Sequence, residues 1–160
     1  MKAITATDIP RSLPSVLALD LAQHYGWAAY CDGDIISGHK KTKLKYRELL
    51  FYRDVVELIY TCKPKVIVFE DVRFAKNVAA GMCAGMWRGL LLCVCQKCGK
   101  ETRGIGVKVI KKHITGNGNA SKEDMIYHIN LRGFDVADDN EADALGVLLT
   151  ALETGVVEKT

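Results

Sequence analysis

The chain has 160 residues, of which 49% are hydrophobic and 26% are charged, and its formal net charge is +3. This size and apolar content favour one globular domain with a buried core, and the weak positive charge excludes a long basic tail. Nucleic acid stays open as a partner, because the local distribution of charge matters more than its sum. We expect a flexible N-terminal arm over residues 1–14 and a single domain over residues 15–155.

The chain is expected to begin with an antiparallel meander. Residues 16–21 form a short apolar run that is interrupted by one acid. Residues 26–30 and 34–37 are two further strand candidates. The Asp32-Gly33 pair between them is a hairpin signal.

Helices and strands then alternate along the chain. Apolar residues at helical spacing predict a helix over residues 43–62, which Pro64 ends. The later elements are expected to be a buried strand over 65–69, a helix over 77–96, a strand over 105–110 and helices over 121–131 and 138–152. This order predicts an α/β fold with a mixed five-stranded sheet, antiparallel at its start and parallel afterwards, flanked by helices.

The most apolar stretch, residues 78–94, is interpreted as a buried helix rather than a membrane span. It carries Arg88 and several glycines, and it is shorter than a spanning helix of about 20 residues. Cys93, Cys95 and Cys98 follow closely on one another, but no second ligand pair at a matching spacing accompanies them. We therefore expect reduced cysteines of an intracellular protein and no zinc site.

Three acids stand where an acid is locally unfavourable. Asp20 interrupts an apolar strand, Glu70 ends one, and Asp143 lies between alanines on a helix that otherwise looks buried. A buried carboxylate needs a cation, a hydrogen-bond donor or a metal ion, and a lone one is more often structural. Three together favour an oxygen-rich site for Mg²⁺ or Mn²⁺. Two such ions can activate water and stabilise the leaving oxygen of a phosphodiester, which predicts a nuclease.

A further acidic cluster leads up to the last of these acids. Helical spacing puts Asp139 and Asn140 on the face of Asp143 and turns Glu141 away from it. Asp138 is expected to cap the helix, and Glu141 stands at a spacing like that of a capping box. If the helix begins later, Glu141 becomes a candidate ligand.

Taken in order, several blocks of the chain resemble the RuvC-type Holliday-junction resolvases, above all their small phage-encoded members. The blocks are residues 16–21, Phe69-Glu70-Asp71-Val72 with Ala75-Lys76-Asn77, Arg88-Gly89, residues 111–122 and Asp143-Ala144-Leu145. The resemblance implies an RNase H-like fold, a homodimer, Mg²⁺ and paired nicking of four-way DNA junctions. It also implies a cytoplasmic protein of a bacterium or a phage-infected host cell.

The resemblance also implies roles for single residues. It assigns metal binding to Asp20, Glu70 and Asp143, and contact near the scissile phosphate or the DNA backbone to Lys111 and Lys122. Lys111 is therefore counted with the catalytic residues.

Two positions depart from the pattern of the family. Asn140 stands where the family usually has an acid or a histidine, and as an uncharged side chain it is a weaker candidate metal ligand. Asp139 or Glu141 is expected to take that place instead, or the site works with three carboxylates. Arg73 stands where the family commonly has an aromatic wedge, and Phe74 follows it. Either the wedge has shifted by one residue or junction opening works differently, and forks and flaps join the expected substrates.

Basic residues around the glycine-rich loop 116–119 predict a DNA contact. Lys111 and Lys122 flank this loop, and backbone amides at a helix start together with nearby lysines make a phosphate cradle. The other residues expected to contact DNA are Arg73, Phe74, Lys76, Lys112 and Asn117. The basic run from Lys40 to Arg47 fits a solvated face as well as a DNA contact.

The segment from Ala79 to Gly89 is rich in small residues, which let another helix approach closely. Part of it must pack on the chain's own sheet. The family resemblance implies that the other part forms a two-fold dimer contact, in which Met82, Met86 and Trp87 would be the apolar anchors.

Two other functions compete with the nuclease. A catalytically weak or inactive branched-DNA-binding protein of the same fold is the main alternative, and Asn140 is its support. A nucleotide-binding protein similar to actin-like ATPases needs phosphate loops in two lobes and a longer chain.

Overall fold

The computed structural model describes residues 13–41, 45–72 and 77–157. Within these ranges one sheet has five strands in the order β3-β2-β1-β4-β5. The strands are β1 (Val16–Asp20), β2 (His24–Cys31), β3 (Asp34–Lys41), β4 (Val66–Asp71) and β5 (Glu101–Gly106). β1 to β3 form an antiparallel meander, while β4 runs parallel to β1 and β5 parallel to β4. The predicted mixed sheet is confirmed, and the predicted arm lies almost wholly outside the described residues.

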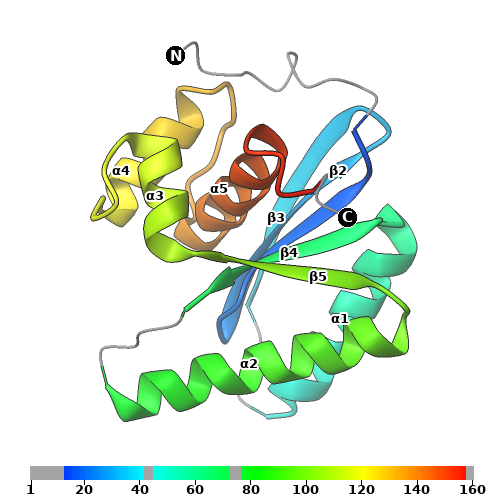
Figure 1. Cartoon of the computed structure of the whole chain (residues 1–160). Coiled ribbons are helices and arrows are strands. Elements are labelled where there is room, and N and C mark those ends of the chain that lie inside the picture. The colour runs from blue at the N-terminus through cyan, green and yellow to red at the C-terminus, as the bar shows by residue number, and fades with distance from the viewer. Residues whose placement is uncertain (1–12, 42–44, 73–76, 158–160) are drawn as a thin grey trace.

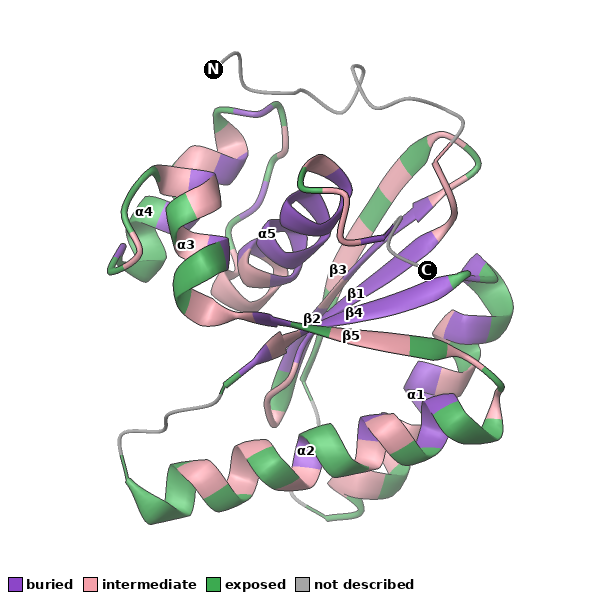
Figure 2. Cartoon of the chain, in the orientation of Figure 1, coloured by how far each residue is buried: buried purple, intermediate pink, exposed green. Residues whose placement is uncertain are grey.

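Helices cover both faces of the sheet (Figure 1). α1 (Arg47–Cys62) and α2 (Val78–Lys97) lie on one face, and α5 (Asp139–Glu153) lies on the other. α3 (Val107–Thr115) and α4 (Lys122–Asn130) pack against α5 on its far side. α5 is therefore enclosed between the sheet and two helices, and it is buried over most of its length (Figure 2).

The alternation of side chains along β1 and β4 divides the core into two clusters. Val16, Ala18, Val66 and Val68 belong to the cluster under α5. The residues between them belong to the cluster under α1 and α2, among them Leu19. Successive side chains of a strand point to opposite faces of the sheet. The position of an acid near the end of β1 or β4, counted from these core residues, therefore decides which face the acid occupies.

The strand predicted over residues 105–110 is wrong. β5 ends at Gly106, and the chain continues directly into α3. Ile110 and Ile114, four residues apart, are both buried, as one face of a helix requires. The valines and isoleucines of this segment look like a strand, whereas β5 is an edge strand made of polar residues and glycines apart from Ile105, and it carries no apolar alternation.

α2 is long and apolar enough, by length and composition alone, to cross a membrane. Four of its residues, however, are buried in the cluster between α1, α2 and the sheet: Trp87, Leu91, Val94 and Cys95. One face of α2 thus belongs to the core of its own chain, which accounts for that part of its apolar sequence.

Candidate active site

Strand parity places two of the predicted acids on the α5 face of the sheet. Asp20 ends β1 on the side of Ala18, and Glu70 lies in β4 on the side of Val68. The parallel register pairs Leu19 with Phe69, so the two acids are next to each other at the carboxyl ends of adjacent strands. α5 crosses this face and carries the third acid, Asp143.

The charges of the three acids act on one another. Burial, the charge of Glu70 and the charge of Asp143 raise the pKa of Asp20 well above its usual value. Burial and the charge of Asp143 raise the pKa of Glu70 to about 7. Burial raises the pKa of Asp143 to about 6, against the opposing effect of two nearby lysines. The structure therefore brings Asp20, Glu70 and Asp143 into one electrostatically coupled cluster.

The two lysines are Lys111 of α3 and Lys122 of α4. Both lower the pKa of Glu70 and of Asp143, so both lie close to the acids. Lys111 Nζ donates a hydrogen bond to the Ala120 carbonyl at 2.6 Å, which directs it along the glycine-rich loop. Lys122 forms an ion pair with Asp139. Two lysines, one of them shared with a fourth acid, leave the cluster short of positive charge.

This donor set fits a divalent cation. Hard ions such as Mg²⁺ take carboxylate oxygens, and the cluster offers three carboxylates with pKa values raised by burial and mutual repulsion. Among the described residues no three acid, histidine or cysteine side chains already form a closed ligand group. Binding an ion would therefore require an adjustment of side chains in this cluster.

The residues before Asp143 have distinct places. Asp138 caps α5 by accepting hydrogen bonds from the backbone amides of Asn140 and Glu141, which confirms the predicted cap. The charge of Asp139 raises the pKa of Asp143, so Asp139 is close to the cluster. The Asn140 amide nitrogen donates to Asp138 and Asp139. Glu141 instead accepts a hydrogen bond from Ser37 Oγ at 2.6 Å, so it is held by β3, and its prediction as a ligand does not fit this arrangement.

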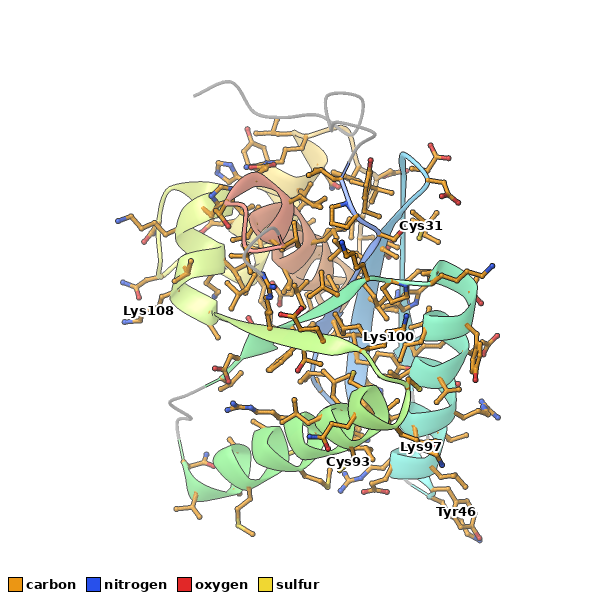
Figure 3. The ribbon with its side chains drawn as sticks, turned by 45° about the vertical axis from the view of Figure 1, so that its right-hand side comes forward. Cys31, Tyr46, Cys93, Lys97, Lys100 and Lys108 are labelled. Atoms are coloured by element: carbon orange, nitrogen blue, oxygen red, sulfur yellow. The ribbon has the colours of Figure 1, made fainter. Side chains whose placement is uncertain are left out.

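Three residues predicted to contact DNA lie outside the described residues: Arg73, Phe74 and Lys76. Asn117 is exposed in the loop before α4, where its side chain accepts a hydrogen bond from the Asn119 amide. Lys112 lies on another face of α3 than Lys111. With Lys108, which projects outwards from α3 (Figure 3), it lines a hollow of about 840 Å³ beside α4.

The predicted dimer anchors separate into two groups. Met82 is 73% exposed, and Met86 is partly buried against the core. Trp87 is 1% exposed and packs at a tilt against Phe51 of α1, with ring centroids 5.1 Å apart. Trp87 is therefore a core residue, and its prediction as a dimer anchor is wrong. The helical phase of α2 turns it towards the sheet, a difference that composition alone does not reveal.

Gly26 is a site residue that reasoning from the sequence missed. It pairs with Asp20 across β1 and β2, and the backbone of Asn140 lies directly over it. A Cβ atom on Gly26 would lie 1.8 Å from the Asn140 carbonyl oxygen. Only glycine allows the first turn of α5 to come this close to the sheet beside Asp20. A glycine within a strand is the one sequence signal of such an approach.

Comparison with known proteins finds relatives of one family. The family model for the crossover junction endodeoxyribonuclease RuvC matches residues 22–151. Among curated relatives, the RuvC of Brachyspira hyodysenteriae is 29% identical over 119 residues, which are 74% of this chain and 74% of that protein. The RuvC of Rickettsia prowazekii is 26% identical over 151 residues, 86% of this chain and 96% of that protein.

Solved structures show the same fold. A structure described as T. thermophilus RuvC in complex with Holliday junction substrate superposes with a TM-score of 0.71 at 20% identity, over 89% of this chain and 96% of that one. The fowlpox virus Holliday junction resolvase has a TM-score of 0.53 at 12% identity, over 88% of this chain and 99% of that one. These matches confirm the predicted RNase H-like fold. On the match of the family model, the chain belongs to the RuvC family of crossover junction endodeoxyribonucleases.

Proposed function

We propose that this chain is a Mg²⁺-dependent endonuclease that resolves four-way DNA junctions, with Mn²⁺ as a second usable ion. The observation that supports this most is the cluster of Asp20, Glu70 and Asp143, whose raised pKa values reflect buried like charges that two lysines do not offset. The names of the curated relatives and the junction-bound structure supply the reaction and the substrate. The bacterial relatives support the cytoplasm of a bacterium or a phage-infected cell as its place of action.

The acids and the lysines of the site have different proposed roles. Divalent ions, when bound, supply activation of water and stabilisation of the leaving oxygen. Asp20, Glu70 and Asp143 would hold such ions. Lys111 and Lys122 lie close enough to lower the pKa values of the acids, and there they can contact the phosphate that approaches them. Since the acids are assembled around these lysines, the site does not favour the alternative of an inactive DNA-binding protein.

Cleavage and binding can be tested separately. The full chain would be mixed with labelled four-way, three-way, fork and duplex DNA, in Mg²⁺, in Mn²⁺ and in EDTA, with binding measured in Ca²⁺. We expect nicking of the four-way junction in Mg²⁺ and none for Glu70→Gln, with the dissociation constant for the junction little changed. Asp32→Asn is the matched control, because Asp32 is an exposed acid in the β2–β3 turn at the other end of the sheet. Junction binding without nicking in either ion would contradict the nuclease and favour the binding protein.

The outer face of α2 supports a homodimer. It exposes Val78, Met82, Gly85, Gly89 and Cys93, a stripe at helical spacing that carries no charge. Cys93 lies on the side of α2 that faces away from the sheet (Figure 3). Two glycines in the stripe let a second helix approach closely, and a two-fold contact would place two sites for paired nicking.

The oligomeric state tests this stripe. Sedimentation of the full chain should give a dimer, and Met82→Asp should shift it to a monomer. Leu49→Asp is the control, because Leu49 of α1 is also exposed, at 65%, but lies off the stripe. A wild-type monomer at the concentrations that give paired nicking, or a Met82→Asp dimer, would exclude this interface.

A further inference from the structure

The edge strand β3 contacts the first turn of α5. Ser37 and His39 lie on the α5 face of β3, on the same side as Ile35, which packs on the core under α5. Ser37 Oγ donates a hydrogen bond of 2.6 Å to Glu141 Oε1. His39 Nδ1 lies 3.7 Å from Glu141 Oε2, and its Nε2 lies 3.8 Å from Asp138 Oδ2. Two residues of β3 thus hold two residues of α5 from one side.

These contacts are directly in line with the active site. In the sheet register His39 pairs with Gly26, and Gly26 pairs with Asp20. The three residues form one row across β3, β2 and β1. The backbone of Asn140 lies over the middle of this row, at Gly26. A sideways movement of the first turn of α5 would therefore carry it along the row, towards or away from Asp20.

The other contacts of the first turn of α5 are the ion pair between Lys122 and Asp139 and the approach of the Asn140 backbone to Gly26. From Ala142 to Leu152 the helix is buried on almost every side, but Asp139, Asn140 and Glu141 are polar and only partly buried. Asp143 follows at the boundary between these two parts. Its position relative to Asp20 and Glu70 thus depends on how the polar turn is held.

We infer that Ser37 and His39 are positioning residues of the nuclease site, acting through Glu141 and Asp138 to fix the turn of α5 that precedes Asp143. The inference rests on the proposed function and deepens it. It also gives Glu141 a role, as the acceptor that ties α5 to β3 and not as a metal ligand.

Two substitutions at Glu141 separate positioning from metal binding. In Glu141→Gln the amide oxygen can still accept the Ser37 hydroxyl, whereas Glu141→Ala removes the acceptor. We expect Glu141→Ala and Ser37→Ala to weaken Mn²⁺ binding, measured by calorimetry or electron paramagnetic resonance without DNA, by roughly tenfold, within the range known for residues that orient metal ligands. Single-turnover nicking should fall by a similar factor, with junction binding in Ca²⁺ unchanged. The Mn²⁺ affinity and the nicking rate of Glu141→Gln should stay within about threefold of those of wild type.

The control is Asp34→Ala, since Asp34 is an exposed acid at the start of β3, far along the strand from Ser37 and His39. Urea unfolding of every variant distinguishes a local displacement of the first turn of α5 from loss of the folded structure. Equal Mn²⁺ binding by wild type and Glu141→Ala would overturn the inference. Equal losses in Glu141→Gln and Glu141→Ala would also overturn it, because they would make Glu141 a ligand.

Failure of the proposed function gives a different pattern. A wild-type chain that binds Mn²⁺ but cuts no branched DNA would refute the nuclease, while the Mn²⁺ affinities of the variants still decide the role of Ser37. A wild-type chain that neither binds Mn²⁺ nor cuts would overturn both.

Discussion

Gly26→Ala tests whether the contact between α5 and the sheet sets the active site. The new Cβ atom would lie 1.8 Å from the Asn140 carbonyl oxygen and 2.3 Å from its carbonyl carbon. Non-bonded carbon and oxygen atoms need roughly 3.3 Å, so the backbone of Asn140 must move by roughly 1.5 Å. Because both groups are backbone or fixed to it, a change of side-chain rotamer cannot relieve this contact.

The expected loss is larger in activity than in stability. Forced repacking of this kind costs about 1–3 kcal/mol of the free energy of unfolding. Asp143 lies less than one helical turn beyond Asn140, so it moves with the displaced turn. A displacement of about 1 Å at a catalytic group can reduce the rate roughly 100-fold. We therefore expect a folded protein whose junction nicking falls by about two orders of magnitude.

The assay compares single-turnover nicking in Mg²⁺, junction binding in Ca²⁺ and urea unfolding for Gly26→Ala and Gly106→Ala. Gly106 is the control because it also lies in a strand, at the end of β5, and a Cβ atom there meets nothing within 4 Å. Gly106→Ala should nick at the normal rate. If folded Gly26→Ala nicked within about threefold of wild type, far from the loss that a displaced catalytic group causes, the contact at Gly26 would not set the position of Asp143.

Three further predictions concern the charge cluster and the core. Asp20→Asn should abolish nicking and yet raise the melting temperature in EDTA at pH 8, because it removes the free-energy cost of burying an ionisable carboxyl beside Glu70 and Asp143; normal nicking, or a lower melting temperature, would contradict this. Folding raises the pKa of Glu70 from 4.5 to about 7 and that of Asp143 from 3.8 to about 6, so the folded state disfavours the charged carboxylates. This free-energy penalty on folding is fully present above the raised pKa values, and it is lost as the pH falls from them towards the ordinary values. Urea unfolding in EDTA should therefore show stability increasing from pH 8 to pH 5.5, by about 2 kcal/mol for Glu70 alone, and a decrease over that range would refute the burial of these charges. Trp87→Ala should cost about 3–5 kcal/mol in the same measurement, against less than about 0.5 kcal/mol for Met82→Ala in the monomer, and a small loss at Trp87 would contradict its burial.

The acids of the site were predictable because each leaves a local mark in the sequence. Asp20 and Glu70 end apolar strands, and alternation along those strands puts both on one face. Asp138 carries the signal of a helix cap, and the structure confirms it. Such marks need only the neighbouring residues, so one chain without relatives is enough to find them.

The remaining features depend on contacts between distant segments. Ser37 and Glu141 are 104 positions apart in the chain, and no local pattern joins them. The close approach at Gly26 likewise involves Asn140, on the other side of the chain's midpoint. The phase of α2, which buries Trp87 and exposes Met82, is decided by the sheet beneath it and not by the apolar residues that both faces share.

The proposed active site joins two parts that are held in different ways. Asp20 and Glu70 belong to adjacent parallel strands, whose register leaves them little freedom. Asp143 comes from α5, which must bring this carboxyl into a buried layer next to those of Asp20 and Glu70. Repulsion among the carboxylates opposes the approach of the helix. The cap at Asp138, the contact over Gly26 and the bond from Ser37 all act within the first turn of α5, just before that charge. These three contacts therefore hold the first turn of α5 against the repulsion among the acids. A bound cation would attract all three carboxylates and so replace that repulsion by attraction.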